Sequence, residues 1–238
     1  LSQHSIKGDS LILGFGGGIL PKELSKKNFN IDVVEINPAT LKIAEKYFKY
    51  KKKNTNFFFE DARTFVKKCR KRYDLIIVDL FFEDGSPEHL TTVEFYKDLK
   101  NCLKDEGVLV SNTIADFSDD LTLNTILSTF NAVFKNINYF YDNIYVDESI
   151  LKTTNLYILA SNKKEYKNLN IKLENVPNIM RLQIFRTLKN NNEFKKENFN
   201  KENILFDENN QYSKIFSKSL ASYRKIVSAA VPSRILIN

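Results

Sequence analysis

Strand and helix patterns alternate along residues 10–160, and this alternation limits the possible folds more than any other feature. Apolar runs lie at residues 11–13, 31–35, 56–59, 74–79 and 107–112, and helical patterns follow them at 19–27, 38–48, 62–69, 93–103 and 121–134. Two last strands are expected at 139–146 and 155–160. Repeated strand–helix units favour a parallel sheet with helices on both faces. We therefore predict an α/β fold with one sheet domain at residues 8–162.

Residues 163–238 differ from this domain in composition. Lys and Asn are frequent there, and the polar stretch at 188–203 is interpreted as a loop or linker. Residues 212–227 carry apolar side chains at helical spacing, which is typical of an amphipathic helix that docks on a domain or a partner. We predict a C-terminal helical extension.

Composition excludes several classes of protein. The 238 residues are 42% hydrophobic, too apolar for a wholly disordered chain, and no apolar run approaches the ~20 residues of a membrane helix. From the lack of such a run we expect no membrane partner. Cys69 and Cys102 have no CxxC partner, so we expect reduced thiols and a cytoplasmic protein. The sequence begins with Leu1 and has no cleavable signal, which suggests that its natural start is missing.

The net charge of +7 arises from 36 Lys+Arg against 29 Asp+Glu. Only seven of the 36 are arginine, the residue on which nucleic-acid readers usually rely for bidentate contacts. We interpret most of the charge as solvated surface, with a nucleic-acid partner as the alternative. That alternative requires positive charge around the mouth of the site and salt-dependent binding.

A glycine turn follows the first predicted strand. Gly14, Gly16 and Gly18 form a G-x-G-x-G pattern, whereas a dinucleotide fingerprint needs a glycine where Ile19 stands. Glycines let the backbone turn tightly and approach a ligand. The spacing suits a nucleoside with an amino-acid-like tail and no pyrophosphate; a purely structural turn is the other interpretation.

Acidic residues follow the next two predicted strands. Glu35 ends the second strand, where a carboxylate can accept hydrogen bonds from both ribose hydroxyls, although it could be a solvated acid. Asp61 follows the third strand, where it could accept from an exocyclic amine of adenine. An Asp at this place is also a good helix N-cap, and the two roles are compatible.

A third acid, Asp79, ends the very apolar fourth strand. It could accept a proton from an amine or hold that amine in line with an electrophilic carbon. A capping or loop role is the alternative. Phe81 and Phe82 follow at gate or core positions, and His89 is either a base or a surface or gate residue. We expect no metal site, since no His/Cys/Asp cluster has ligand spacing.

Six motifs, in order, carry a resemblance to a known family. They are residues 13–18 (LGFGGG), 34–38 (VEINP), 60–63 (EDAR), 73–79 (YDLIIVD), 87–96 (PEHLTTVEFY) and 107–112 (GVLVSN). Over about residues 8–160 the chain resembles the spermidine synthase-like branch of the class I S-adenosylmethionine-dependent transferases. The resemblance implies a Rossmann-like, doubly wound, seven-stranded sheet. It also implies S-adenosylmethionine or decarboxylated S-adenosylmethionine as the donor.

The resemblance assigns roles to particular residues. Glu35 matches the ribose-binding acid, Asp61 the adenine-side acid and Asp79 the catalytic acid, while Pro87 and Tyr96 match the gate loop and the helix behind the active site. We therefore predict donor-binding residues Gly14, Gly16, Gly18, Glu35, Ile36, Asp61 and Ala62, and substrate or gate residues Phe81, Phe82, Pro87, His89 and Tyr96.

Two departures from the family pattern concern the acceptor. Aminopropyltransferases carry an acid inside the glycine turn, where this chain has Gly17, and a second acid three residues after the catalytic one, where it has Phe82. A diamine with two positive charges is bound best by several carboxylates, which form charge-assisted hydrogen bonds with its ammonium groups. We therefore expect transfer of an alkyl group to an amine, with a slight preference for methyl over aminopropyl.

Three alternatives stay open: a true polyamine aminopropyltransferase, a nucleic-acid or protein methyltransferase, and a catalytically silent binding protein. The acceptor is either a small amine or a macromolecule, and a homodimer is one option for assembly.

Overall fold

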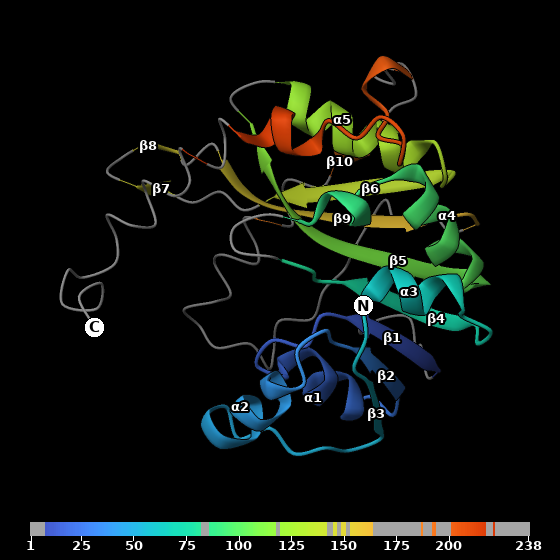
Figure 1. Ribbon diagram of the computed structural model, residues 1–238, viewed down its shortest axis with the longest axis vertical. Helices are drawn as coiled ribbons and strands as arrows, with labels where there is room; N and C mark the ends of the chain where they lie inside the picture. Colours follow the sequence, from blue (N-terminus) through green and yellow to red (C-terminus); the bar gives the residue numbers. More distant parts are fainter. Residues whose placement is uncertain are drawn as a thin grey trace.

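The computed structural model describes residues 8–81, 86–117, 120–141, 145–146, 149–150, 153–163, 187, 192–193, 201–217 and 221. Its strands are β1 (Asp9–Leu13), β2 (Asn30–Val34), β3 (Thr55–Phe58), β4 (Tyr73–Val78), β5 (Leu103–Asp116), β6 (Asn136–Tyr141), β7 (Tyr145–Val146), β8 (Ser149–Ile150), β9 (Thr153–Ser161) and β10 (Asn192–Glu193). Its helices are α1 (Ile19–Ser25), α2 (Ala39–Tyr47), α3 (Ala62–Lys67), α4 (Val93–Asn101) and α5 (Asp120–Asn131), with short 3-10 turns η1 (Glu88–Leu90) and η3 (Lys201–Asn203) (Figure 1).

The main sheet has the strand order β10-β6-β9-β5-β4-β1-β2-β3. The five strands from β3 to β5 are parallel, as the repeated strand–helix units predict. The sheet as a whole is mixed, because β9, one of the two last predicted strands, runs antiparallel to both β5 and β6. A parallel pair needs a long crossover, usually a helix, and the chain follows β6 with β7 and β8 before β9.

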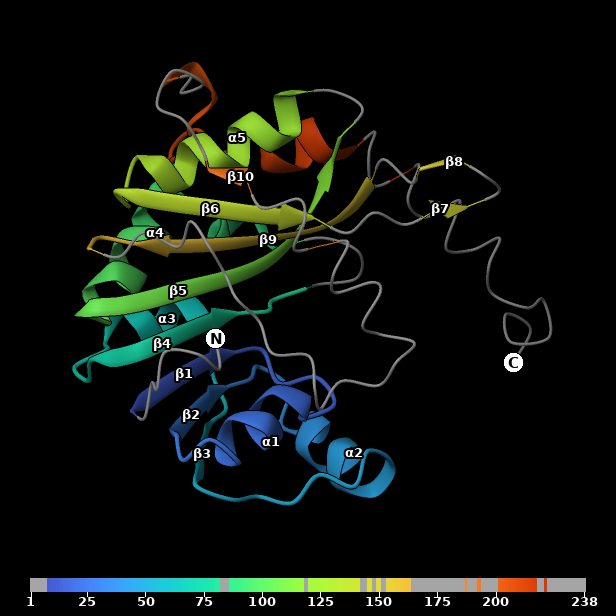
Figure 2. The same ribbon diagram turned by 180° about the vertical axis from the view of Figure 1, so that it is seen from behind.

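Alternate residues of the parallel strands face two separate cores. Leu11, Leu13 and Ile76 pack with side chains of α3, α4 and α5, whereas Ile12 and Ile77 pack with side chains of α1 and α2. Figure 2 shows α1 in front of β1 to β3, while α3 and α4 lie behind the sheet. Since both faces are covered, the strands can be apolar throughout, as Leu75–Val78 is. This arrangement confirms the doubly wound α/β prediction.

Part of the C-terminal extension packs into the first of these cores. Leu205, Tyr212 and Phe216 are at most 3% exposed and belong to the cluster that holds α4 and α5. Residues 212–217 are helical and the Tyr212 and Phe216 rings stack 4.1 Å apart, whereas the predicted end of this helix at 227 lies outside the described residues. The predicted loop at 188–203 contains β10, which pairs with β6, and η3. The boundary at 162/163 stays a prediction.

Candidate active site

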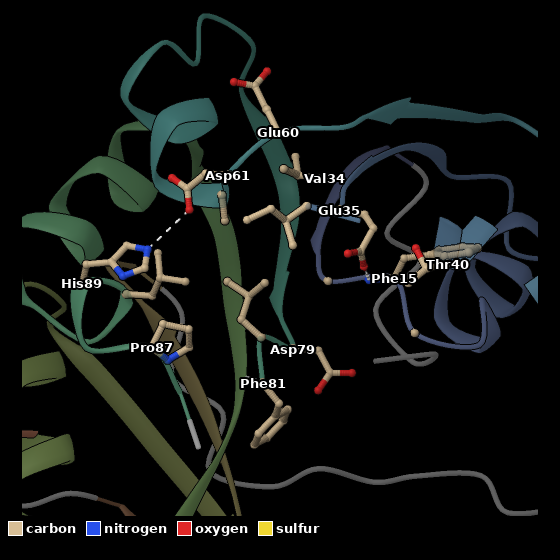
Figure 3. A pocket seen from close by; sticks show the side chains of 16 residues that line it. Phe15, Val34, Glu35, Thr40, Glu60, Asp61, Asp79, Phe81, Pro87 and His89 are labelled. Atoms are coloured by element: carbon tan, nitrogen blue, oxygen red, sulfur yellow. Dashed lines mark hydrogen bonds and ion pairs between the residues drawn. The ribbon is translucent and has the colours of Figure 1, made fainter. Parts of the chain in front are cut away.

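A cavity of about 660 Å³ opens at the carboxyl ends of the parallel strands. It lies where the strand order reverses, with β1 between β2 and β4, the place where open α/β sheets bind ligands. Its size is within the usual range for small-molecule sites. The lining residues, shown in Figure 3, are Gly14, Phe15, Gly16, Val34, Glu35, Ile36, Thr40, Glu60, Asp61, Ala62, Asp79, Leu80, Phe81, Pro87, His89 and Leu90.

The glycine turn after β1 forms the floor of this cavity. Gly14 has φ +92°, and a Cβ there would lie 2.2 Å from the backbone oxygen of Asp79. Gly16 has φ +53° and nothing within 4 Å of its Cβ position, so it borders open space. Gly18 is different: it is not a lining residue, and its Cβ would meet the Tyr50 and Phe15 rings. It begins α1 with a left-handed backbone, and its predicted role in donor binding stays a prediction.

Gly14→Ala is expected to destabilise the fold by about 2–3 kcal/mol or more, because the new Cβ strains a left-handed backbone and collides with an inflexible carbonyl. Gly16→Ala, with the same added methyl group but open space around it, should cost only about 1 kcal/mol. Urea unfolding of both variants measures the difference. Equal losses would show that the close approach of Gly14 to β4 is unimportant.

Glu35 is oriented by backbone amides at the end of β2. Its Oε2 accepts from the N–H of Phe15 at 3.1 Å and its Oε1 from the N–H of Asn37 at 2.9 Å. The first of these bonds ties the carboxylate to the glycine turn. Each carboxylate oxygen can accept more than one hydrogen bond, so both retain acceptor capacity toward the cavity.

Asp61 has two partners at the start of α3. Its Oδ1 accepts from the N–H of Thr64 at 2.9 Å, which is the N-cap expected at this position. Its Oδ2 lies 3.4 Å from Nε2 of His89, the contact drawn dashed in Figure 3. Burial acts to raise the pKa of Asp61, but the hydrogen bonds from Thr64 and His89 outweigh it and hold the pKa below its usual value. The carboxylate is therefore ionised at neutral pH and faces the cavity.

Asp79 leaves β4 half-buried, beside Phe81. Its Oδ1 accepts from Nδ2 of Asn112 at 3.0 Å, and its other oxygen has no hydrogen-bond partner within the described part of the chain. Oδ1 of Asn112 is buried and likewise lacks a partner among the described residues. Asn112 thus orients the Asp79 carboxylate and leaves one of its oxygens available.

The other side chains that line the cavity are mostly apolar. Pro87, Leu90 and Phe81 line the cavity, and Ile36 is 71% exposed at its edge. Tyr96 does not line it: the side chain is 6% exposed on α4 and its ring lies 4.1 Å from that of Phe130. Its predicted place at the substrate site is therefore corrected to the core, because its position on α4 turns it toward α5. Phe82 lies outside the described residues.

The charged side chains that line the cavity are mostly acids. Glu35, Glu60, Asp61 and Asp79 contribute carboxylates, and no Lys or Arg belongs to this set of described residues. The net charge of the whole chain is +7, so the local charge has the opposite sign. Within the described chain, no group of three or more His, Cys, Asp or Glu side chains is placed to hold a metal ion.

Sequence reasoning missed several of these residues. Asn112 appears in the sequence only as the end of a strand motif, yet a polar amide in an apolar strand was a usable signal. Thr40 and Glu60 line the cavity because the first turn of α2 and the end of β3 both border it. The lining residues Gly14, Gly16, Glu35, Ile36, Asp61, Ala62, Asp79, Phe81, Pro87 and His89 were all predicted site residues, and their roles stay predictions.

The fold is that of class I methyltransferases and spermidine synthases. A probable spermidine synthase from Corynebacterium glutamicum superposes with a TM-score of 0.62 at 17% identity, over 86% of this chain and 74% of that one. Human methyltransferase-like protein 13, in complex with SAH, superposes with a TM-score of 0.56 at 22% identity, over 79% and 85% of the two chains. At this identity the likeness concerns the fold alone.

Sequence comparison identifies the family. Residues 1–172 match the model of the spermine/spermidine synthase domain, and the chain belongs to this family. The polyamine aminopropyltransferase of Vibrio vulnificus is 38% identical over 130 residues, which are 52% of this chain and 42% of that protein. The N-terminal histidine N-methyltransferase of Emericella nidulans is 36% identical over 130 residues, 51% of this chain and 23% of that protein. The chain thus spans less than half of either relative.

These comparisons bear on the expected reaction. The relatives are mostly polyamine aminopropyltransferases, and one transfers a methyl group. They favour the alternative, aminopropyl transfer, over the slight preference for methyl transfer that the sequence suggested. No helix in the described ranges has the length and apolar character required to span a bilayer.

Proposed function

We propose that this chain transfers an aminopropyl group from decarboxylated S-adenosylmethionine to an amine. The observation that carries the proposal is the cavity at the strand switch point, lined by four carboxylates and by no Lys or Arg among its described residues. A cationic donor and a cationic acceptor both favour such a lining, because opposite charges attract more strongly where water is partly excluded. Membership of the spermine/spermidine synthase family supports the same reaction.

The residues of the cavity fit the donor. Glu35, held by the Phe15 and Asn37 amides, would accept from the ribose hydroxyls. Asp61 would accept from the exocyclic amine of adenine, and Ile36 and Leu90 supply apolar surface for the base. Gly16 leaves open space on the floor for the donor tail. When bound, a sulfonium donor supplies an electrophilic carbon with a good leaving group.

Asp79 is the residue suited to the acceptor. The Asn112 amide orients its carboxylate, and the free oxygen can hold an incoming amine and take its proton. Phe81 lies beside it, and an aromatic face stabilises a nearby cation. The contribution of these residues is alignment and proton acceptance at one nitrogen.

The chain departs from the family pattern where the far end of an acceptor would be held. Gly17 replaces an acid, and a Cβ at this position would lie 3.2 Å from the Phe48 ring, so a larger side chain requires Phe48 to move. The nucleophile proposed at Asp79 is an amine, and the panel of amines below measures which acceptor length the cavity takes.

Titration calorimetry and product mass together test this function. Decarboxylated S-adenosylmethionine should bind more tightly than S-adenosylmethionine, and incubation with a panel of mono-, di- and triamines should yield a product heavier by an aminopropyl group. A product heavier by a methyl group, with tighter binding of S-adenosylmethionine, would replace the proposal by the methyl-transfer alternative. Binding of neither nucleoside would refute both.

A further inference from the structure

A segment of the C-terminal extension lies directly against the cavity wall. We call residues 205–213 the clamp segment and residues 87–92 the wall segment, because Pro87, His89 and Leu90 line the cavity. The clamp segment begins in the core, where the N–H of Leu205 donates to Oγ1 of Thr129 at 3.1 Å. The Leu205 oxygen accepts from the N–H of Val93 at 2.9 Å, just after the wall segment. In Figure 1 this part of the chain, in orange to red, runs beside α5.

Arg63 joins the clamp segment to the wall segment. Its Nη1 donates to Oδ1 of Asp207 at 2.8 Å, and its Nη2 is in close contact with the other oxygen of the same carboxylate. The same Nη1 donates to the backbone oxygen of His89 at 2.5 Å. Asp207 also accepts from Oγ1 of Thr92 at 2.7 Å, at the end of the wall segment. One carboxylate of the extension therefore contacts the wall directly at Thr92 and, through Arg63, at His89.

A second set of bonds holds the start of the wall. Nδ2 of Asn210 donates to the backbone oxygen of Glu88 at 2.6 Å and to Oγ1 of Thr91 at 3.3 Å. The N–H of Ser213 donates to Oε1 of Glu88 at 3.0 Å. The turn η1 is thus hydrogen-bonded to the extension through both the backbone oxygen and the carboxylate of Glu88.

These contacts matter at the cavity because the wall faces the adenine-side acid. His89 on the wall lies 3.4 Å from Asp61, and Arg63 follows Asp61 in the chain by two residues. A shift of the wall segment would therefore change the spacing between His89 and Asp61, and with it the space for the adenine base. Bidentate Arg–carboxylate pairs are strong and orient their partners, and the Arg63 side chain is only 11% exposed.

We propose that the clamp segment positions the cavity wall for the donor nucleoside, with Asp207 and Asn210 as positioning residues. The inference rests on the proposed function, in that the ligand is an adenosyl nucleoside. The hydrogen bond from Arg63 holds the pKa of Asp207 below its usual value, so the clamp is charged at neutral pH. The extension is on this view part of the binding site and not an appendage to it.

Three variants test the proposal in the full chain, with methylthioadenosine as the probe. Asp207→Ala should weaken its binding by about 10-fold, the size expected for lost charge-assisted hydrogen bonds. Asp207→Asn keeps acceptor oxygen for Arg63 or Thr92 and should recover part of the loss. Glu208→Ala removes the neighbouring exposed acid and should bind as the wild type does. Calorimetry gives the affinities.

Hydrogen exchange without ligand provides an independent measurement. The amides of Leu90 and Thr91 are bonded within η1, and they should exchange several-fold faster in Asp207→Ala, while those of β1 and β4 should not change. Should Asp207→Ala fail to fold, Asn210→Ala is measured in its place, with the same expectations. If the wild type binds methylthioadenosine and the variants bind and exchange as it does, the clamp is refuted. If the wild type binds no adenosyl nucleoside, the proposed function fails, and the clamp is judged by exchange alone.

Discussion

Asp79→Asn is expected to lower turnover by about 10²–10⁴-fold and to leave binding of the donor nucleoside unchanged. The substitution keeps the size of the side chain and an oxygen that can accept from Asn112, so the local structure should persist. It removes the charge that would hold the amine and the group that would take its proton. Initial rates with saturating donor and amine, together with donor affinity by calorimetry, measure the two effects separately.

Asp105→Asn is the matched control for this experiment. It makes the same chemical change at an acid whose side chain is 88% exposed, near the amino end of β5 and away from the cavity. We expect its turnover to equal that of the wild type. Wild-type turnover in Asp79→Asn would remove Asp79 from the reaction, and a joint loss of turnover and donor binding would assign it to the donor.

Glu35→Ala is expected to weaken the binding of S-adenosylmethionine, its decarboxylated form and methylthioadenosine alike, by about 10- to 100-fold. The three nucleosides share the ribose, and hydrogen bonds to a charged group contribute about 1.5–3 kcal/mol. Part of the loss would come from the glycine turn, because the Phe15 amide would lose its acceptor. Calorimetric titration with each nucleoside measures the effect.

Two comparison variants separate these contributions. Glu35→Gln retains an oxygen for the Phe15 or Asn37 amide and should bind more tightly than Glu35→Ala. Glu45→Ala, an exposed acid on α2 outside the cavity lining, should have no effect. A loss confined to one of the three nucleosides would contradict the ribose assignment, since all three carry the same sugar.

Much of the parallel half of the sheet could be predicted from local patterns. An apolar run such as 74–79 followed by a helical pattern has one common solution, a buried strand and its crossover helix. The residues just after such strands must then lie at one edge of the sheet. This is why the sequence alone places Glu35, Asp61 and Asp79, which are distant along the chain, at one site.

The antiparallel half could not be predicted in the same way. An apolar strand pattern has no direction, so 155–160 fits equally well as a parallel or an antiparallel neighbour of β5. Gly18 and Tyr96 illustrate a second limit. Their motif positions suggest the site, but neither lines the cavity: the backbone of Gly18 packs against the Tyr50 and Phe15 rings, and α4 places the Tyr96 ring against Phe130.

The sequence by itself determined the strand–helix order, the glycine turn after β1 and the acids at the strand ends, because each depends on residues that are neighbours in the chain. Only the tertiary structure decided that Asn112 orients Asp79 and that Arg63 meets Asp207. Arg63 and Asp207 are 144 residues apart, and their contact depends on how the extension packs against α4 and α5. No local sequence pattern predicts this contact, because it depends on the burial of Leu205, Tyr212 and Phe216 in a core shared with both helices.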